Sequence, residues 1–397
     1  MFENVEAAPP DAILGLTEAY RADRNPEKIN LGVGVYQDER GRTPVLECVK
    51  TATKRLAAEV ASKSYLPISG SPDYAAAVQA LMFGKSHEIV ESRRAVTAHT
   101  PGGTAAVRVA ADFVHQNLPE ATVWLSQPTW ANHPAIFKAA CVPTKTFPYL
   151  DKATGGLDYQ AMMSALKNVP AGDVVLLHGC CHNPCGVDPT LEQWGEVASL
   201  LYSRGVLPLI DFAYQGFADG IEEDAAGLLE FCRPGQEFVV CNSFSKNFGL
   251  YRERVGGVTM VGADEGVAID VASQVKRVIR SNYSNPPSHG GELVVTILHD
   301  ADLREQWEQE VREMRDRING MRSLLVKKLT EHGVPGDHAS IQRQRGMFTI
   351  LALDADHVER LRDDYAIYVV GGGRINVAGI TPANVDRLCH AIAQVVK

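Results

Sequence analysis

A lysine after a short β-branched run is the first residue whose setting suggests chemistry. The segment 238–241 reads Phe-Val-Val-Cys and is followed by Asn-Ser-Phe-Ser-Lys-Asn-Phe-Gly, which places Lys246 in a polar turn after a predicted buried strand. Partial burial and nearby positive charge lower the pKa of a lysine amine, and the neutral amine can form a Schiff base with a carbonyl. Ser243 and Ser245 can donate hydrogen bonds to an anion such as a cofactor phosphate. A surface lysine in an ordinary turn is the alternative, because short motifs often arise by accident.

Two further segments place polar residues next to predicted strands. Asp211 follows the apolar run 207–210, where a carboxylate is costly to bury unless it is paired, for instance with a cationic ring nitrogen. Tyr214 comes three residues later. The segment 102–104, Gly-Gly-Thr, opens a helical pattern, so its free N–H groups and the helix dipole would suit a phosphate. A tight turn with a threonine cap is the alternative there.

Short apolar strands alternate with polar turns and helical patterns from about residue 95 onward. The predicted strands are 95–98, 123–125, 174–177, 207–210 and 238–241. This alternation predicts an α/β fold with a mostly parallel, doubly wound sheet covered on both faces. Ligands of such sheets bind beyond the carboxyl ends of the strands, so we expect Lys246, Asp211 and the Gly-Gly-Thr turn to converge on one pocket.

Local patterns predict several other elements. We expect helices at 13–20, 45–60 and 302–331, the last because apolar residues recur there at threes and fours between charges. We expect a glycine-interrupted strand at 31–36 and a loop at 65–70. The glycines at 32 and 34 lack the third glycine of a dinucleotide fingerprint.

Length, composition and charge limit the class of protein. The chain has 397 residues, of which 45% are hydrophobic and 22% charged, so it can bury a sizeable core and form two domains. A net charge of −9 disfavours nucleic acid or an anionic membrane surface as the main partner. The chain shows neither a secretory signal pattern nor an apolar run of membrane-spanning length. We therefore expect a soluble, cytoplasmic protein.

The eight cysteines are expected to be reduced thiols that serve mainly in packing. The cluster Cys180-Cys181-His182-x-x-Cys185 has a spacing that suits neither a zinc knuckle nor a redox pair. We predict no metal site.

A single cofactor needs all the candidate groups at once. Pyridoxal 5′-phosphate requires a lysine for its aldehyde, a carboxylate for its pyridinium nitrogen and an anion site for its phosphate. Asp211, the serine-containing turn with Ser243 and Ser245, and Lys246 supply these groups and follow one another in this order along the chain. Arg254, eight residues beyond the lysine, would add a fixed positive charge near the phosphate.

Six stretches of the chain together resemble the fold-type I aspartate aminotransferases, in the subgroup shared by bacterial and animal enzymes. The resemblance covers essentially the whole chain, from Phe2-Glu3-Asn4-Val5 to the C-terminal helix. The stretches are Thr100–Thr104, His178–Gly186, Asp211–Phe217, Ser243–Arg254, Ser281–Pro287 and Gly373–Gly379.

The resemblance implies roles at the cofactor ring. Lys246 would carry the cofactor and move a proton between it and the substrate Cα, while Asp211 would keep the pyridine nitrogen protonated. Tyr214 and Asn183 would hydrogen-bond the phenolic oxygen, and Trp130 would stack on the ring. Further implied cofactor contacts, mainly to the phosphate, are Gly102, Gly103, Thr104, Ser243, Ser245, Arg254 and, from the partner subunit of a homodimer with shared sites, Tyr65.

Two arginines are implied in substrate binding. Arg374 resembles the residue that binds the α-carboxylate, a task suited to a guanidinium fork. Arg280 resembles the one that crosses the dimer interface to bind the distal carboxylate; a solvated arginine at a helix end is the alternative. Gly34, Trp130 and Asn183 are also expected at the substrate. The implied reaction is ping-pong exchange of L-aspartate and 2-oxoglutarate with oxaloacetate and L-glutamate.

Aspartate and aromatic specialists differ around the substrate. Residues that match the aspartate-preferring branch are Val35, Thr43, Thr104 and Asn285, whereas Gln37 and Ser64 match neither. The difference in binding is worth only about 1–3 kcal/mol, so side activity on tyrosine and phenylalanine is expected, and an aromatic aminotransferase is the alternative. Cys185 and Pro67 depart from the usual threonine and glycine of relatives beside expected cofactor residues.

The resemblance also implies domains. Residues 1–42 would form an N-terminal arm and part of a small α/β domain, 43–310 a large cofactor-binding domain, and 311–397 the rest of the small domain. Three other classes are less consistent with the sequence. A cofactor-sensing transcription factor would need a DNA-binding module, a β-lyase or decarboxylase seldom needs a second carboxylate clamp such as Arg280, and a cofactor-free relative would not need Lys246.

Overall fold

The computed structural model describes residues 1–7, 14–59 and 62–397. The chain divides into two compact units, one combining Met1–Thr43 with Arg317–Lys397 and the other being Pro44–Asp316. None of the helices in the described ranges is long and apolar enough to cross a membrane.

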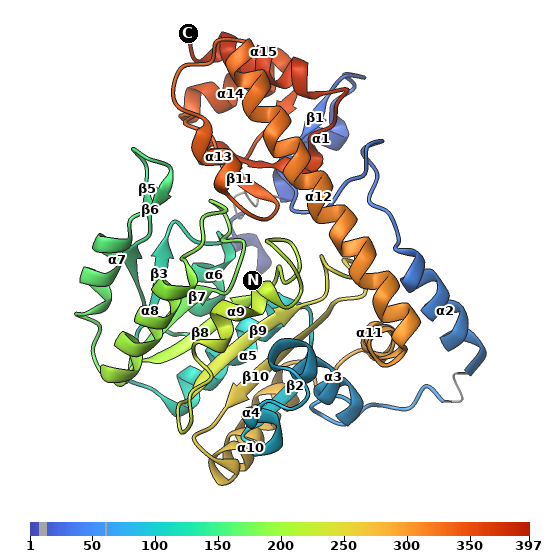
Figure 1. Ribbon diagram of the computed structural model, residues 1–397, viewed down its shortest axis with the longest axis vertical. Helices are drawn as coiled ribbons and strands as arrows, with labels where there is room; N and C mark the ends of the chain where they lie inside the picture. Colours follow the sequence, from blue (N-terminus) through green and yellow to red (C-terminus); the bar gives the residue numbers. More distant parts are fainter. Residues whose placement is uncertain (8–13, 60–61) are drawn as a thin grey trace. The chain divides into compact units, whose positions relative to one another are not determined.

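A mostly parallel sheet forms the centre of the unit Pro44–Asp316 (Figure 1). Seven strands in the described part of this unit run in the order β2-β10-β9-β8-β7-β3-β4. The strands are β2 (Ala95–Pro101), β3 (Val123–Gln127), β4 (Thr144–Pro148), β7 (Val174–His178), β8 (Leu207–Phe212), β9 (Phe238–Ser243) and β10 (Val255–Val261). Strand β10 is antiparallel to both neighbours, and the other described pairs are parallel. The predicted α/β class with a mostly parallel sheet is confirmed.

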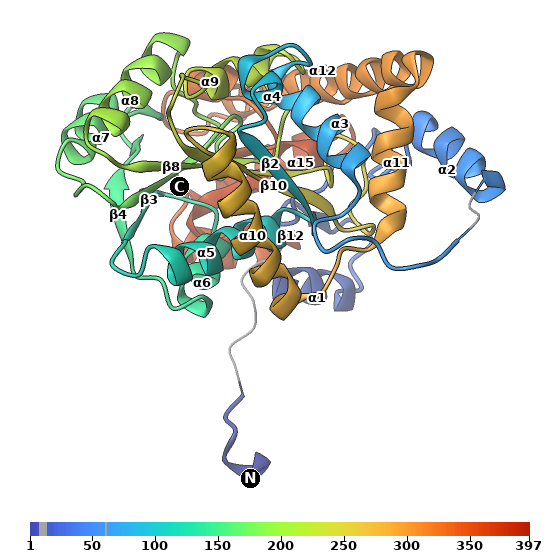
Figure 2. The ribbon, with the colours of Figure 1, turned by 90° about the horizontal axis from the view of Figure 1, so that it is seen from below.

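Helices cover both faces of this sheet. Figure 2 shows α5, α6 and α10 on one face and α3, α8 and α9 on the other. The helices are α2 (Glu47–Glu59), α3 (Pro72–Phe83), α4 (Glu88–Glu91), α5 (Gly103–Asn117), α6 (Asn132–Ala139), α7 (Tyr159–Leu166), α8 (Leu191–Ser203), α9 (Ala226–Leu229), α10 (Glu265–Asn282), α11 (Ser288–His299) and α12 (Ala301–Glu331). Small residues on α5, including Ala106, Ala110 and Ala111, let it pack closely on the strands in a fully buried core. A two-stranded ribbon, β5 (Leu150–Asp151) with β6 (Gly156–Leu157), lies outside the sheet.

The other unit has two short strand pairs and several helices. Strand β1 (Ile29–Asn30) pairs in parallel with β12 (Ile367–Tyr368), and β11 (Phe348–Ile350) pairs antiparallel with β13 (Arg374–Asn376). Its helices are α1 (Leu14–Ala22), α13 (Ala339–Arg343), α14 (Ala355–Tyr365), α15 (Val385–Val395) and the last part of α12.

The local predictions fare unequally. The helix at 302–331 is confirmed by α12, and the loop at 65–70 is confirmed. The helices at 13–20 and 45–60 are confirmed as α1 and α2, although residues 13 and 60 lie outside the described ranges. The strand at 31–36 is wrong. The side chain of Asn376 donates to the carbonyls of Val33 and Val35, so a side chain rather than a neighbouring strand satisfies this backbone.

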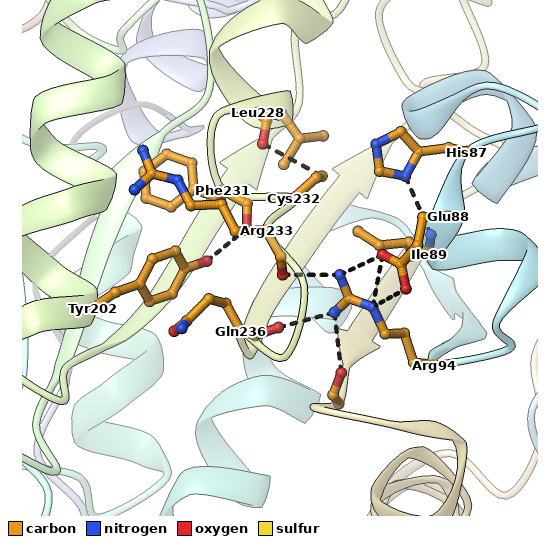
Figure 3. A network of polar contacts seen from close by, with 11 residues as sticks. His87, Glu88, Ile89, Arg94, Tyr202, Leu228, Phe231, Cys232, Arg233 and Gln236 are labelled. Atoms are coloured by element: carbon orange, nitrogen blue, oxygen red, sulfur yellow. Dashed lines mark hydrogen bonds and ion pairs between the residues drawn. The ribbon is translucent and has the colours of Figure 1, made fainter.

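A buried arginine, Arg94, lies at the edge of the sheet where β2 begins (Figure 3). The side chain of Arg94 is 2% exposed and binds the carboxylate of Glu88 through both Nε and Nη2, with N···O distances of 2.9 to 3.1 Å. The remaining N–H groups donate to the carbonyls of Arg233, Gln236 and Gly262. Every N–H of this guanidinium therefore has an acceptor.

Candidate active site

Lys246 lies just beyond the carboxyl end of β9, against Tyr214. The Lys246 Nζ atom is 4.5 Å from the centroid of the Tyr214 ring, and that ring is buried. Burial lowers the pKa of Lys246 to about 8, helped by the positive charge of Arg254 and opposed by the negative charge of Asp211. A substantial fraction of this amine is therefore neutral, and so nucleophilic, slightly above neutral pH.

Asp211 stands near the carboxyl end of β8, directly opposite Cys241 of β9. Its Oδ2 atom is 3.0 Å from Nε2 of the fully buried His133. Burial raises the pKa of this carboxyl, but the hydrogen bond from His133 and the electrostatic interactions with His133, His178 and Lys246 outweigh burial and hold the pKa below its usual value. Asp211 is thus kept as a buried carboxylate, able to accept a second hydrogen bond from a cationic partner.

His133, Thr129 and His178 were not predicted as site residues from the sequence. The Thr129 hydroxyl lies 2.8 Å from Nδ1 of His133 and 3.1 Å from Nε2 of His178, so it bridges the two rings. Burial lowers the pKa of His178 to about 3, aided by His133. His133 follows Trp130 by one turn at the start of α6, and their rings meet edge to face at 5.1 Å. In the sequence, the three-residue spacing between the predicted Trp130 and His133 is the signal that could have pointed to His133.

The turn after β9 and the start of α5 form an anion-binding cradle. The hydroxyl of Ser245 lies 3.2 Å from that of Ser243 and 3.3 Å from Nη1 of Arg254. Gly102, with φ +82°, precedes α5, and a Cβ atom at this position would overlap with the guanidinium of Arg254. Gly103 lies close to Ser243, because a Cβ there would lie 3.0 Å from the serine Cβ. The predicted phosphate residues are therefore gathered at the N-terminus of α5, where N–H groups of Gly103 and Thr104 begin the helix.

This arrangement fits pyridoxal 5′-phosphate. The cradle offers hydroxyls, a guanidinium and helix N–H groups, which are donors suited to a phosphate. Asn183 is 5% exposed, and its Oδ1 atom has no hydrogen-bond partner among the described residues. A bound group that donates a hydrogen bond would satisfy this buried amide oxygen. Trp130, half-buried beside His133, presents an aromatic face at the same sheet edge.

Arg280 and Tyr65 lie on the surface of this unit. Arg280 is in the last turn of α10, where it donates to the hydroxyl of Ser284. It borders a hollow of about 440 Å³ lined by Ile68, Gln116, Lys276, Arg277, Arg280 and Ser281. Tyr65 is 92% exposed, which is unusual for a tyrosine that does not meet a partner.

Arg374 and Gly34 come together in the other unit. Arg374 is 7% exposed, donates to the carbonyl of Gly32, and its guanidinium carbon is 4.5 Å from the centroid of the Phe348 ring. A Cβ atom at Gly34 would lie 2.9 Å from the same ring. Phe348 was not predicted from the sequence; it places Gly34 and Arg374 on a shared aromatic surface.

All eight cysteines are free. The ligand atoms of Cys180, Cys181 and Asp224 lie within 4.8 Å of one another. The Asp224 carboxylate, however, already accepts backbone N–H groups of Gly216, Ala218, Asp219 and Gly220. Since its lone pairs are used, this group is a poor metal ligand.

The fold and this geometry define an α/β enzyme site in which an amine of lowered pKa, an ionised acid and an anion cradle meet at the carboxyl edge of one sheet. Residues 26–392 match the family described as Aminotransferase class I and II, and the chain belongs to this family.

Curated relatives cover the chain from end to end. The aspartate aminotransferase of Salmonella typhi is 51% identical over 396 residues, with 100% of each chain covered. The aromatic-amino-acid aminotransferase of Pseudomonas aeruginosa is 45% identical, with 99% of this chain and 98% of the relative covered. Among solved structures, an aromatic-amino-acid aminotransferase of Burkholderia pseudomallei, covalently bound to pyridoxal phosphate, has a TM-score of 0.96 at 44% identity, with 100% of both chains covered.

Proposed function

We propose that this chain is an aspartate aminotransferase that uses pyridoxal 5′-phosphate to exchange L-aspartate and 2-oxoglutarate with oxaloacetate and L-glutamate. The observation that carries the proposal is the amine of Lys246, with its pKa lowered to about 8, lying 4.5 Å from the Tyr214 ring centroid. The full-length similarity to aspartate aminotransferases at about half identity supports the same reading.

When bound, the cofactor supplies an aldehyde that bonds to amines and a ring that delocalises negative charge from an amino acid's Cα. Lys246 would hold the cofactor through Nζ, and the same atom would accept the Cα proton of the amino acid and return it. Asp211, held ionised by His133, keeps a proton on the ring nitrogen. Tyr214 and Asn183 bind the phenolic oxygen, and Trp130 orients the ring.

The phosphate cradle is proposed to include a residue from a second copy of the chain. Ser243, Ser245 and Arg254, with the start of α5, hold the phosphate. Tyr65, almost fully exposed in one subunit, completes the cradle of its partner in a homodimer. The acidic chain is proposed to work in the cytoplasm.

The substrates are proposed to be dicarboxylates. Arg374 binds the α-carboxylate with its guanidinium fork. Arg280 binds the distal carboxylate in the partner's site, and it lines a hollow together with Lys276 and Arg277. Of these cations only Arg280 is proposed to contact the substrate, since Arg277 donates to the side chain of Gln274 on its own helix. The relatives named for aromatic substrates support a second activity on tyrosine and phenylalanine.

Substitution of the lysine tests the cofactor assignment. The purified wild-type protein should absorb visible light, and borohydride reduction should attach the cofactor's mass to the peptide that contains Lys246. Lys246→Ala should lose both the attachment and turnover, by at least about 10⁴-fold. Turnover retained in this variant would remove the central assignment.

Arg280→Asp tests the substrate class. The variant should lose most of its kcat/KM for aspartate and gain preference for cationic amino acids, while kcat/KM for phenylalanine changes little. Arg277→Asp, a charge reversal on the same helix outside the proposed clamp, is the matched control. Undiminished aspartate turnover in Arg280→Asp would refute the clamp, and a wild-type ratio that favours tyrosine over aspartate would support the aromatic alternative.

A further inference from the structure

The turn that carries Lys246 is tied to the loop that carries Tyr214 by a side chain with no proposed chemical role. Asn247 directly follows Lys246, and Gln215 directly follows Tyr214. The Nδ2 atom of Asn247 donates to the backbone carbonyl of Gln215 over 3.1 Å. Because a carbonyl can only accept, the amide nitrogen must face it. One hydrogen bond therefore joins the residues next to the two reacting groups.

The loop on the Gln215 side is a fixed platform. The side chain of Gln215 donates to the carbonyls of Leu81 and Ile221 over 3.2 and 2.8 Å. Beyond it, the carboxylate of Asp224 accepts the backbone N–H groups of Gly216, Ala218, Asp219 and Gly220. The loop cannot shift without the loss of several buried hydrogen bonds. The hydrogen bond from Asn247 therefore fixes the lysine turn relative to a rigid loop.

A second contact holds the backbone of Asn247. The indole Nε1 of Trp307, on α12, donates to the Asn247 carbonyl over 2.8 Å. The Trp307 ring also stacks on Phe248, with centroids 4.5 Å apart and planes 21° apart. Both Trp307 and Asn247 are buried, at 0% and 2% exposure. The residue after the lysine is thus fixed through its side chain on one side and its main chain on the other.

Stability alone does not account for an asparagine here. Its Oδ1 atom has no hydrogen-bond partner among the described residues, and a buried polar atom without a partner lowers stability. That cost is comparable to what the Nδ2 bond contributes. The contact is better explained by what it positions.

We propose that Asn247 is a positioning residue that holds the Lys246 turn in register with the Tyr214 loop, so that Nζ sits over the Tyr214 ring at the observed distance. The inference rests on the proposed function, since it concerns the same lysine. Its physical consequence is that loss of the Asn247 link lets the amine drift from the phenol. A misplacement of about 1 Å near reacting atoms can cost 10²-fold in rate.

Three holoenzyme variants test this role. Asn247→Ala removes the link to Gln215, and Trp307→Phe removes the hydrogen bond to the Asn247 carbonyl but keeps the ring on Phe248. Tyr202→Phe is the matched control, because it removes one part-buried hydrogen bond to a main-chain carbonyl, that of Phe231, at 2.7 Å and in the remote cluster around Arg94 (Figure 3). The readouts are the pH midpoint of the visible absorption, kcat, KM and the melting temperature.

Asn247→Ala should shift the pH midpoint of the visible absorption upward by about 0.5–1 unit, because the Tyr214 hydroxyl then stabilises the deprotonated form of the absorbing group less strongly. The variant should also lower kcat about tenfold, with little change in KM. Trp307→Phe should shift the midpoint in the same direction by less. Tyr202→Phe should lower only the melting temperature.

Specific outcomes overturn the inference. If Asn247→Ala keeps the wild-type midpoint and kcat and only melts earlier, as the control does, the residue is merely structural. If Asn247→Ala does not fold, an unshifted midpoint in Trp307→Phe refutes the role and a shifted one supports it. Absence of visible absorption in the wild-type protein would instead reject the proposed function.

Discussion

Two buried polar clusters lie at opposite edges of the same seven-stranded sheet in the described part of the unit Pro44–Asp316. At the edge where β2 begins, Arg94 has an acceptor for every N–H group (Figure 3). At the edge where β2, β8 and β9 end, Lys246 has a lowered pKa, and oxygen atoms of Asn183 and Asn247 find no partner among the described residues.

The difference separates two uses of buried polarity. A fully satisfied network locks a loop, a helix and two strand ends together, because no member can leave without exposing the others unpaired. A partly satisfied site holds its groups ready for a ligand and contributes less to stability. We therefore expect substitutions in the Arg94 cluster to change stability and those in the site to change chemistry.

Substitution of Arg94 should have the largest effect on stability. Arg94→Ala leaves three carbonyls without their donor, while the carboxylate of Glu88, 48% exposed, can be solvated by water, and the substitution should lower the free energy of unfolding by about 2–4 kcal/mol. Urea denaturation of the holoenzyme measures this loss, and kcat per folded molecule should stay within about twofold of wild type. Arg93→Ala is the control, since Arg93 is 80% exposed with an acid 3.7 Å away, and it should stay within about 0.5 kcal/mol. A loss of less than 1 kcal/mol in the free energy of unfolding of Arg94→Ala would contradict the proposed difference between the two clusters.

Substitution of His133 should change chemistry more than stability. His133→Phe removes the donor to Asp211, so burial raises the pKa of Asp211 and the carboxylate is lost at a higher pH. In the pH profile of kcat/KM, the acid limb should move to higher pH, and kcat should fall about 10- to 100-fold. His178→Phe should move the limb less, because His178 meets Thr129 rather than Asp211. An unmoved limb in His133→Phe would show that Asp211 stays ionised without this histidine.

The smallest effect concerns the lysine amine itself. In the apoenzyme, reductive methylation of Lys246 should rise with pH through a midpoint of about 8, because the neutral amine reacts and an ordinary lysine titrates near 10.4. Arg254→Gln removes a positive charge that lowers this pKa, so the midpoint should rise by less than about one unit. Site-resolved mass spectrometry measures both values. A wild-type midpoint near 10 would place the amine in solvent and contradict its burial.

The sequence was most informative where short-range patterns decide structure. Alternation of apolar runs with polar turns predicted β2, β3, β7, β8 and β9, and helical spacing predicted α12. The strand predicted at 31–36 failed because the competing hydrogen bonds come from Asn376, which is more than three hundred residues away in sequence. Local preference cannot weigh a partner that only folding brings near.

By itself, the sequence determined three chemical groups that follow predicted strands: a lysine, an aspartate and a serine-containing turn. Because the strands that carry them are parallel, the sequence also predicted that these groups meet at one edge of the sheet. Only the tertiary structure decided how those groups are tuned. His133 holds Asp211 ionised, Asn247 links the lysine turn to the tyrosine loop, and burial lowers the pKa of Lys246. Such tuning depends on distances and burial between segments far apart in the chain, which no local pattern encodes.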